Sequence, residues 1–172
     1  MENSRSELIS LDKEIKTLTL YIGLQQLRFI NKFDYEITID PRINIKTTCI
    51  PPMLAQPFIE NSIEHGLMHL KSKGNISIHF GINENTITIE VVDDGIGLKQ
   101  SKLINMKRES YTSFATSITY ERLNLIRGGN KNIGIIITDR SDTEGLNGTS
   151  VNIEVPYKTI IKKSKNETMV SN

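Results

Sequence analysis

The sequence lacks the residues that mark several common classes of protein. Among its 172 residues there is one cysteine, Cys49, which excludes an intrachain disulfide and a metal site made of several cysteines. The 21 basic and 20 acidic side chains nearly balance, whereas nucleic-acid-binding domains usually carry a marked basic excess. No apolar run approaches the about 20 residues of a membrane-spanning helix, and the N-terminus does not resemble a signal peptide. These absences favour a reduced, cytoplasmic domain with no nucleic-acid partner.

Hydrophobic spacing predicts the secondary structure of a single domain. Apolar residues three and four apart predict a helix over residues 6–30, and Ser10 or Asp12 could cap its start. Its apolar stripe includes Leu27 and is broadened by neighbours such as Leu24, so a partner helix is expected. The further predicted elements are strands over 33–39, 76–82, 86–92, 132–139 and 149–156, helices over 53–68 and 116–127, and a loop over 98–115 that could hold a short helix.

The order of these elements predicts an α+β fold. The hairpins favour a mixed, mainly antiparallel sheet, and the helices most simply cover one of its faces, which gives a two-layer sandwich. The polar and basic residues 158–172 are expected to form a disordered tail.

The first segment with chemical potential is QPFIENSIEHG, residues 56–66. On a regular helix Asn61 and His65 share one edge, while Ile59 and Ile63 lie on the opposite side, toward a sheet. The amide oxygen of Asn61 is a suitable ligand for Mg²⁺, which takes oxygen ligands and keeps several waters. For this segment taken alone, a local hydrogen bond or cap is the simpler explanation of Asn61.

Two further segments contain glycines: one follows a predicted strand, and the other precedes one. Asp93 stands at a strand end, just before Gly95 and Gly97, and glycines allow a backbone to approach a ligand closely. The carboxylate of Asp93 can accept a hydrogen bond from an exocyclic amine. Gly148 and Thr149 open the last strand. Taken alone, each segment is also explained by an ordinary turn.

Together, the order and spacing of these segments resemble the ATP-binding catalytic domain of LytS-like sensor histidine kinases, within the superfamily of gyrase, histidine kinase and MutL ATPases. In that branch the first segment reads close to QPLVENAIKHG, against QPFIENSIEHG here. The preceding Ile50-Pro51-Pro52 also fits the branch, as does the pair of segments Tyr21-Ile22 and Leu27-Arg28-Phe29. The resemblance implies a Bergerat-type ATP-binding fold.

The resemblance also implies cofactors and residue roles. It implies ATP and Mg²⁺, with Asn61 holding the metal at the phosphates and Asp93 accepting from the adenine amino group. Glu60 and His65 are implied as catalytic residues beside the phosphates. The other implied cofactor-binding residues are Gly95, Gly97, Ser113, Ala115, Thr116, Arg122, Gly148 and Thr149.

Three departures from the family pattern affect these expectations. The box that ends the lid usually reads close to GIGLKNVRERL, and here Ser113 and Ala115 replace its two glycines. Asp94 stands where an asparagine is usual, which places another negative charge near the site. Pro57 stands four residues before Asn61, where the ATPase branches carry the carboxylate that activates water. Phosphoryl transfer to a nucleophile supplied elsewhere is therefore favoured over hydrolysis.

The resemblance predicts a phosphorelay to a response regulator. No family-like acceptor segment surrounds His65, His69 or His79, so the acceptor histidine is expected outside this chain, on dimerisation helices. Residues 1–31 are then the C-terminal helix of that region or its remnant, and residues 32–157 the catalytic domain. The full-length protein is expected to be a homodimeric inner-membrane sensor, with this chain as a cytoplasmic part. The alternatives are a degenerate pseudokinase or nucleotide sensor acting through protein contacts, an ATPase of the same superfamily, or an anti-sigma-factor serine kinase.

Overall fold

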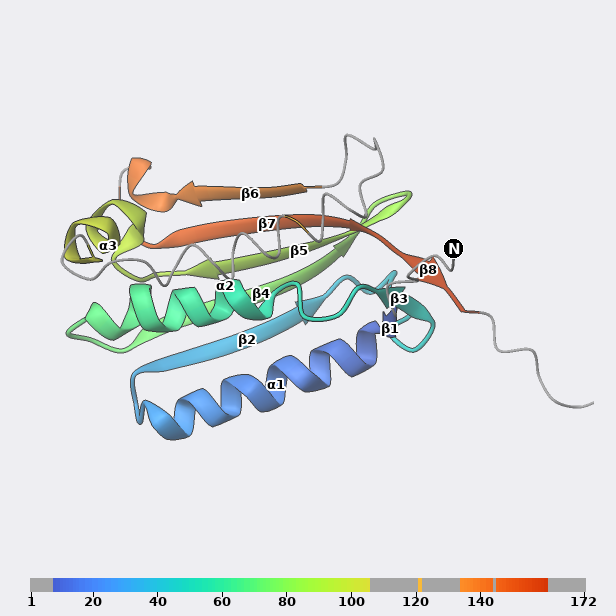
Figure 1. Cartoon of the computed structure of the whole chain (residues 1–172), viewed down its shortest axis with the longest axis horizontal. Coiled ribbons are helices and arrows are strands. Elements are labelled where there is room, and N and C mark those ends of the chain that lie inside the picture. Colours follow the sequence, from blue (N-terminus) through green and yellow to red (C-terminus); the bar gives the residue numbers. More distant parts are fainter. Residues whose placement is uncertain (1–7, 106–120, 122–133, 144, 161–172) are drawn as a thin grey trace, which may run out of the picture.

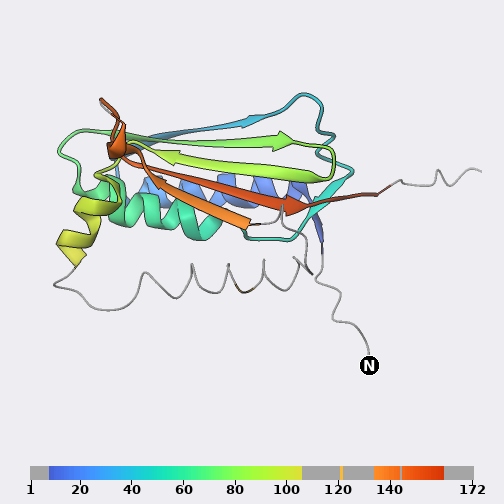
Figure 2. The ribbon, with the colours of Figure 1, turned by 90° about the horizontal axis from the view of Figure 1, so that it is seen from above.

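A five-stranded sheet with helices on one face forms the body of the molecule (Figures 1 and 2). The computed structural model describes residues 8–105, 121, 134–143 and 145–160. In Figure 2 the helices lie on one side of the sheet, and none of the described elements covers the other side. The predicted two-layer α+β architecture is confirmed.

The main sheet has the strand order β2-β4-β5-β7-β6. Its first strand, β2 (Phe33–Ile39), runs parallel to β4 (Gly74–Ile82). The remaining pairings, β4 with β5 (Thr86–Asp93), β5 with β7 (Thr149–Pro156) and β7 with β6 (Gly134–Asp139), are antiparallel. The sheet is therefore mixed and mainly antiparallel, as the alternating sequence patterns predict.

A second, smaller sheet joins both ends of the described chain. In it β3 (Thr48–Ile50) lies between β1 (Ile9–Ser10) and β8 (Lys158–Thr159), and both pairings are antiparallel. Lys158 and Thr159 belong to the segment expected to be a disordered tail. That expectation is wrong for these two residues because β3 supplies their hydrogen-bonding partner.

The first helix, α1 (Leu11–Arg28), is shorter than the predicted 6–30. Ser10 caps it, since its Oγ accepts a hydrogen bond from the backbone N–H of Lys13 at 3.4 Å. The face of α1 that includes Leu11, Leu18 and Ile22 is fully buried. Leu27, expected in this stripe, is 75% exposed, and Leu20 and Leu24 are exposed with it. The sheet covers only one side of α1, so the wider apolar stripe faces solvent.

The second helical segment begins at Gln56 rather than at residue 53 as predicted. It consists of α2 (Gln56–Asn61), a π-helical turn (Ser62–Gly66) and a 3₁₀ turn (Leu67–His69). Pro57 lies in the first turn, where its missing N–H costs no helical hydrogen bond. The backbone N–H of Leu67 reaches back to the carbonyl of Ser62, five residues earlier, which widens the helix here. Such π-turns occur frequently at functional sites.

The predicted loop over 98–115 begins with a helix, α3 (Gly97–Asn105). The short helix that the sequence allowed there is thus present. The predicted helix over 116–127 lies outside the described residues, apart from Glu121.

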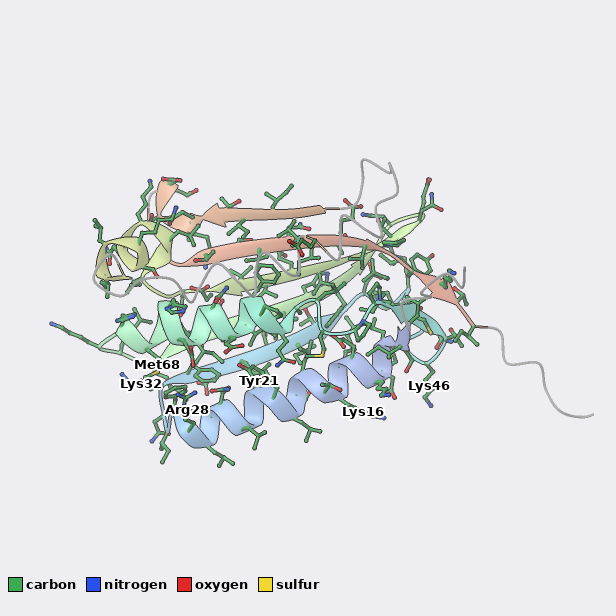
Figure 3. The ribbon with its side chains drawn as sticks, in the orientation of Figure 1. Lys16, Tyr21, Arg28, Lys32, Lys46 and Met68 are labelled. Atoms are coloured by element: carbon green, nitrogen blue, oxygen red, sulfur yellow. The ribbon has the colours of Figure 1, made fainter. Side chains whose placement is uncertain are left out.

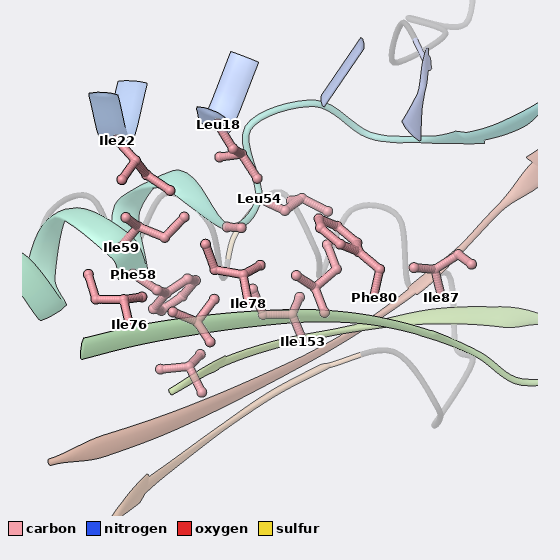
Figure 4. Packing of buried hydrophobic residues seen from close by; sticks show 14 of the residues in the cluster. Leu18, Ile22, Leu54, Phe58, Ile59, Ile76, Ile78, Phe80, Ile87 and Ile153 are labelled. Carbon is pink, nitrogen blue, oxygen red and sulfur yellow. The ribbon is translucent and has the colours of Figure 1, made fainter. Parts of the chain in front are cut away.

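One hydrophobic core lies between the helices and the sheet (Figure 4). Leu18 and Ile22 of α1 and Ile59 of α2 pack toward Ile78 and Phe80 of β4. Because α1 contributes to this same core, residues 1–31 and 32–157 do not separate into two cores in the described part of the chain. Among the described residues there is no helix of sufficient length and hydrophobicity to cross a membrane.

Candidate functional site

The centre of the site is the carboxyl group of Asp93, at the end of β5. Only 2% of Asp93 is exposed. Its Oδ1 accepts hydrogen bonds from the backbone N–H groups of Gly95 at 2.9 Å and Thr149 at 3.3 Å, and its Oδ2 accepts from the Ser62 hydroxyl at 2.8 Å. Burial raises the pKa of Asp93, and the hydrogen bonds from Ser62, Gly95 and Thr149 oppose part of this rise. A buried carboxylate with three donors is a strong and well-oriented acceptor.

Glycines bring three distant segments against this carboxylate. A Cβ on Gly95 would lie 2.7 Å from the Cα of Gly66, and a Cβ on Gly66 would lie 3.1 Å from Oδ1 of Asp93. Gly148 has a φ of +96°, and a Cβ there would lie 1.9 Å from the Asp93 carbonyl oxygen. No side chain fits at Gly95 or Gly148, and a side chain at Gly66 would crowd the Asp93 carboxylate. The structure thus joins the three segments that the sequence analysis singled out separately.

Gly97 and Asp139 form the next part of the site, at the start of α3. Gly97 has a φ of +75°, and a Cβ on it would lie 2.8 Å from Oδ1 of Asp139. Oδ2 of Asp139 accepts from the backbone N–H of Lys99 at 2.9 Å. Burial raises the pKa of Asp139, but hydrogen bonds from Ser141 and Lys99 lower it by more, so the pKa lies below its ordinary value. Asp139 therefore caps α3 from a neighbouring strand.

The carboxylate of Asp94 is bound outside this centre. It accepts from the backbone N–H of Asn75 at 2.7 Å and from the Asn75 side-chain amide at 2.8 Å. Its negative charge still raises the pKa of Asp93, as the smallest of the effects on that group. The residue that departs from the family asparagine thus fixes the end of β5 to the beginning of β4.

Arg140 supports Asp93 through the main chain. Its Nη1 donates to the carbonyl oxygen of Asp93 at 2.9 Å, and its backbone N–H donates to the carbonyl oxygen of Gly148 at 2.9 Å. Arg140 follows β6, Asp93 ends β5 and Gly148 precedes β7. These two bonds therefore hold three strand ends together around the carboxylate.

The side chains expected beside a phosphate chain lie on the second helical segment. Asn61, the last residue of α2, and His65, in the π-turn, are both half-buried, whereas Glu60 is exposed. Ile59 and Ile63 are fully buried in the core, as their predicted placement toward a sheet requires. The π-turn changes the regular 100° spacing that was assumed between Asn61 and His65.

Tyr21 and Arg28 of α1 lie beside this helical segment (Figure 3), whereas Leu27 is exposed. Nη1 of Arg28 lies 3.2 Å from Oε1 of Glu64, and the Arg28 guanidinium stacks 4.7 Å from the centre of the Phe29 ring. Burial, followed by the nearby Glu60 and Glu64 carboxylates, raises the pKa of Tyr21 to about 12. Tyr21 and Arg28 therefore lie at the contact between α1 and the helical segment that carries Asn61.

Four predicted site residues lie outside the described residues: Ser113, Ala115, Thr116 and Arg122. Within the described ranges there is no group of three or more His, Cys, Asp and Glu side chains that could hold a metal ion.

Sequence reasoning missed Ser62, Asp139 and Arg140 as parts of the site. Ser62 had a usable signal, because it stands where the family segment has alanine. Asp139 and Arg140 had none, since their roles depend on which strand ends meet in space.

Solved histidine kinase structures share this fold. The catalytic domain of the histidine kinase ThkA matches with a TM-score of 0.58 and 14% sequence identity, over 87% of this chain and 95% of that chain. A structure of ThkA in complex with the response regulator protein TrrA matches with a TM-score of 0.56 and 13% identity, over 87% of this chain and 41% of that chain. The fold is therefore that of a histidine kinase ATP-binding domain.

The sequence relatives of the chain include sensor proteins of the LytS type and a further sensor histidine kinase. The sensor protein LytS of Staphylococcus epidermidis is 28% identical over 175 residues, which cover 98% of this chain and 28% of that protein. The sensor histidine kinase YpdA of Escherichia coli is 36% identical over 98 residues, which cover 57% of this chain and 17% of that protein. No protein-family model matches the chain. The resemblance to LytS-like sensor histidine kinases is confirmed, and the chain spans 28% of the length of the LytS relative.

Proposed function

We propose that this chain is the ATP-binding catalytic domain of a two-component sensor histidine kinase. The larger protein transfers the γ-phosphoryl group of ATP to a histidine outside this chain, for relay to a response regulator. The observation that carries the proposal is the buried Asp93 carboxylate, enclosed by glycines from three separate segments.

Asp93 is the proposed acceptor for the 6-amino group of adenine. A buried site that is built to accept from an amine disfavours a base that lacks the donor, because the carboxylate is then left unpaired. The glycines suit a nucleotide because they keep side chains out of the contacts around the carboxylate. Gly97 lies next to Asp139 and close to the carbonyl oxygen of Gly148, and the backbone N–H of Thr149 donates to Asp93.

Asn61 is the proposed ligand of Mg²⁺. It is half-buried at the end of α2, and its amide oxygen is a ligand type that this ion accepts, together with phosphate oxygens and waters. Bound Mg²⁺ supplies neutralisation of the phosphate charge during transfer. Glu60 and His65 are the proposed catalytic residues on the same helical segment, where they would orient water and phosphate.

Pro57 favours transfer to a protein nucleophile over hydrolysis. The structure places it in the first turn of α2, four residues before Asn61. A proline side chain carries no group that can activate water, which an ATPase of this superfamily needs at that position. Phosphoryl transfer needs mainly positioning and charge neutralisation from the nucleotide-binding domain.

The proposed partners are histidine-bearing dimerisation helices and a response regulator. The solved complex of ThkA with the response regulator protein TrrA supports the second partner by analogy of fold. We further propose that the full-length protein is homodimeric and that this chain is a cytoplasmic part of an inner-membrane sensor.

Calorimetric titration of the chain with ADP and with a non-hydrolysable ATP analogue, in the presence of Mg²⁺, tests the nucleotide site. The wild-type chain is expected to bind both, and Asp93→Asn is expected to lose at least about tenfold in affinity because the charged acceptor is gone. Asp40→Asn, just after β2 at the opposite end of the sheet from Asp93, is the matched control and keeps the wild-type affinity. Wild-type affinity in Asp93→Asn would contradict the adenine assignment.

A pseudokinase or nucleotide-sensing module is the second candidate function. It is favoured by the replacement of both glycines of the lid box, by Ser113 and Ala115. Nucleotide binding by the chain, without phosphorylation of the histidine-bearing segment in the full-length protein, would support this candidate over the kinase.

A further inference from the structure

We propose that Ser62 is a specificity-determining positioning residue, whose hydroxyl fixes Oδ2 of Asp93 as the acceptor for a 6-aminopurine. This inference rests on the proposed nucleotide site. It concerns a residue of the segment QPFIENSIEHG whose side-chain hydroxyl donates a hydrogen bond to the Asp93 carboxylate.

The hydrogen bonds already made by Asp93 determine where a ligand can bind. A carboxylate offers about two acceptor positions on each oxygen. Oδ1 accepts from the backbone N–H groups of Gly95 and Thr149, whereas Oδ2 accepts from Ser62. The open acceptor position is therefore on Oδ2, and an incoming amine meets the oxygen that Ser62 holds.

Ser62 is itself held rigidly. It is 6% exposed and begins the π-turn Ser62–Gly66, and the backbone of Gly66 lies against Gly95. A serine inside a helix commonly bonds to the carbonyl four residues earlier. Here the hydroxyl instead reaches across 31 residues of sequence to Asp93, at 2.8 Å.

The hydroxyl is not needed to build the helix. Backbone hydrogen bonds and the buried Ile59 and Ile63 hold this helical segment, whereas the Ser62 hydroxyl donates outside it, to Asp93. The serine therefore adds a donor to the carboxylate without a requirement from the fold. Without this donor, Asp93 has two backbone N–H groups on Oδ1, and the orientation of Oδ2 toward a purine is no longer fixed.

Ser62→Ala in this chain tests the inference, with ADP and IDP titrated calorimetrically in the presence of Mg²⁺. ADP carries the 6-amino donor, whereas IDP carries an oxygen there and gains nothing from the Ser62-oriented acceptor. The affinity for ADP is expected to fall about tenfold, as for a lost hydrogen bond to a charged group. The affinity for IDP is expected to stay within about twofold, so that the preference for ADP collapses.

Thr19→Ala, at an exposed position of α1, is the control for loss of a hydroxyl that bonds elsewhere, since it donates to the Ile15 carbonyl, and the variant is expected to retain the wild-type ratio of ADP to IDP affinity. Thermal unfolding of both variants without nucleotide checks that the fold is kept. If Ser62→Ala loses affinity for ADP and IDP equally, the role of Ser62 is structural and the inference is overturned. The inference is also overturned if neither affinity changes. If the wild-type chain binds ADP and Asp93→Asn abolishes this binding, the proposed function stands whatever the result for Ser62→Ala. A wild-type chain that does not bind ADP overturns both proposals.

Discussion

At the scale of single residues, the Asp93 carboxylate has opposite effects on the stability of the empty chain and on the proposed binding of adenine. Its pKa is raised in the folded chain, chiefly by burial, above the ordinary value of 3.8. The folded state therefore binds this proton more tightly than the unfolded state does. The resulting contribution to stability is fully present below about pH 4 and is lost as the pH rises through the raised pKa. The carboxylate proposed to hold adenine thus destabilises the empty protein near neutral pH.

Asp93→Asn removes this titration. The melting temperature of the variant without nucleotide is expected to rise relative to wild type as the pH increases from about 4 to about 8. Asp40→Asn is the control, because the hydrogen bonds from Arg42 lower the pKa of Asp40 to about 2 and keep it ionised across this range. Its difference from wild type is expected to stay constant. A difference between Asp93→Asn and wild type that does not vary with pH would contradict the burial effect.

The site residues differ in how far the sequence could predict them. Asp93 and the glycines were predictable because each motif needs a defined residue type at a defined spacing. Ser62 was visible only as a departure from the family segment. Arg140 was unpredictable, since its bond to the Asp93 carbonyl exists only when the ends of β5 and β6 are brought together by the order of the sheet.

At the scale of elements, α3 depends on a cap from another part of the chain. Asp139 ends β6 and accepts from the backbone N–H of Lys99, in the first turn of α3. Asp139→Ala is expected to lower the stability of α3 by about 1–2 kcal/mol, because an N–H at the helix start loses its charged acceptor. Hydrogen exchange of the α3 amides measures this loss. Asp142→Ala removes only the exposed ion pair with the Lys99 ammonium and is expected to cost less than about 0.5 kcal/mol. Equal protection of α3 in the two variants would rule out the cap.

Local pattern predicted strands better than it predicted helices. The strands β2, β4 and β5 follow the alternation of apolar residues closely, because a strand with one buried face requires that alternation. The helix at Gln56 started three residues later than predicted, and its π-turn was not foreseen. A π-turn has no period of its own in the sequence, and here it accompanies the close packing of Gly66 against Gly95. The pairing that forms β8 likewise depends on β3, more than 100 residues earlier in the chain.

At the scale of the whole molecule, α1 and the sheet share one hydrophobic core. The apolar stripe predicted a partner helix for residues 6–30, and the family resemblance implied that residues 1–31 belong to a dimerisation region. In the described part of the chain the sheet and α2 are that partner for Leu11, Leu18 and Ile22. Glu14 strengthens the connection, since its buried carboxylate accepts from the backbone N–H of Met53 at 3.0 Å. Membership of residues 1–31 in a dimerisation region of the larger protein stays a prediction.

A shared core implies that α1 and the nucleotide-binding sheet unfold together. Leu18 is fully buried in that core, whereas Leu24 of the same helix is 65% exposed. Leu18→Ala is expected to lower the free energy of unfolding of the whole domain by about 2–4 kcal/mol, because it removes buried methyl groups and leaves a cavity. Leu24→Ala is expected to change it by less than about 0.5 kcal/mol. Urea unfolding followed by helical circular dichroism and by loss of ADP binding should give one coincident transition, shifted only in Leu18→Ala. If α1 folded as a separate unit, Leu18→Ala would shift the helical signal and leave the transition of the nucleotide site unchanged.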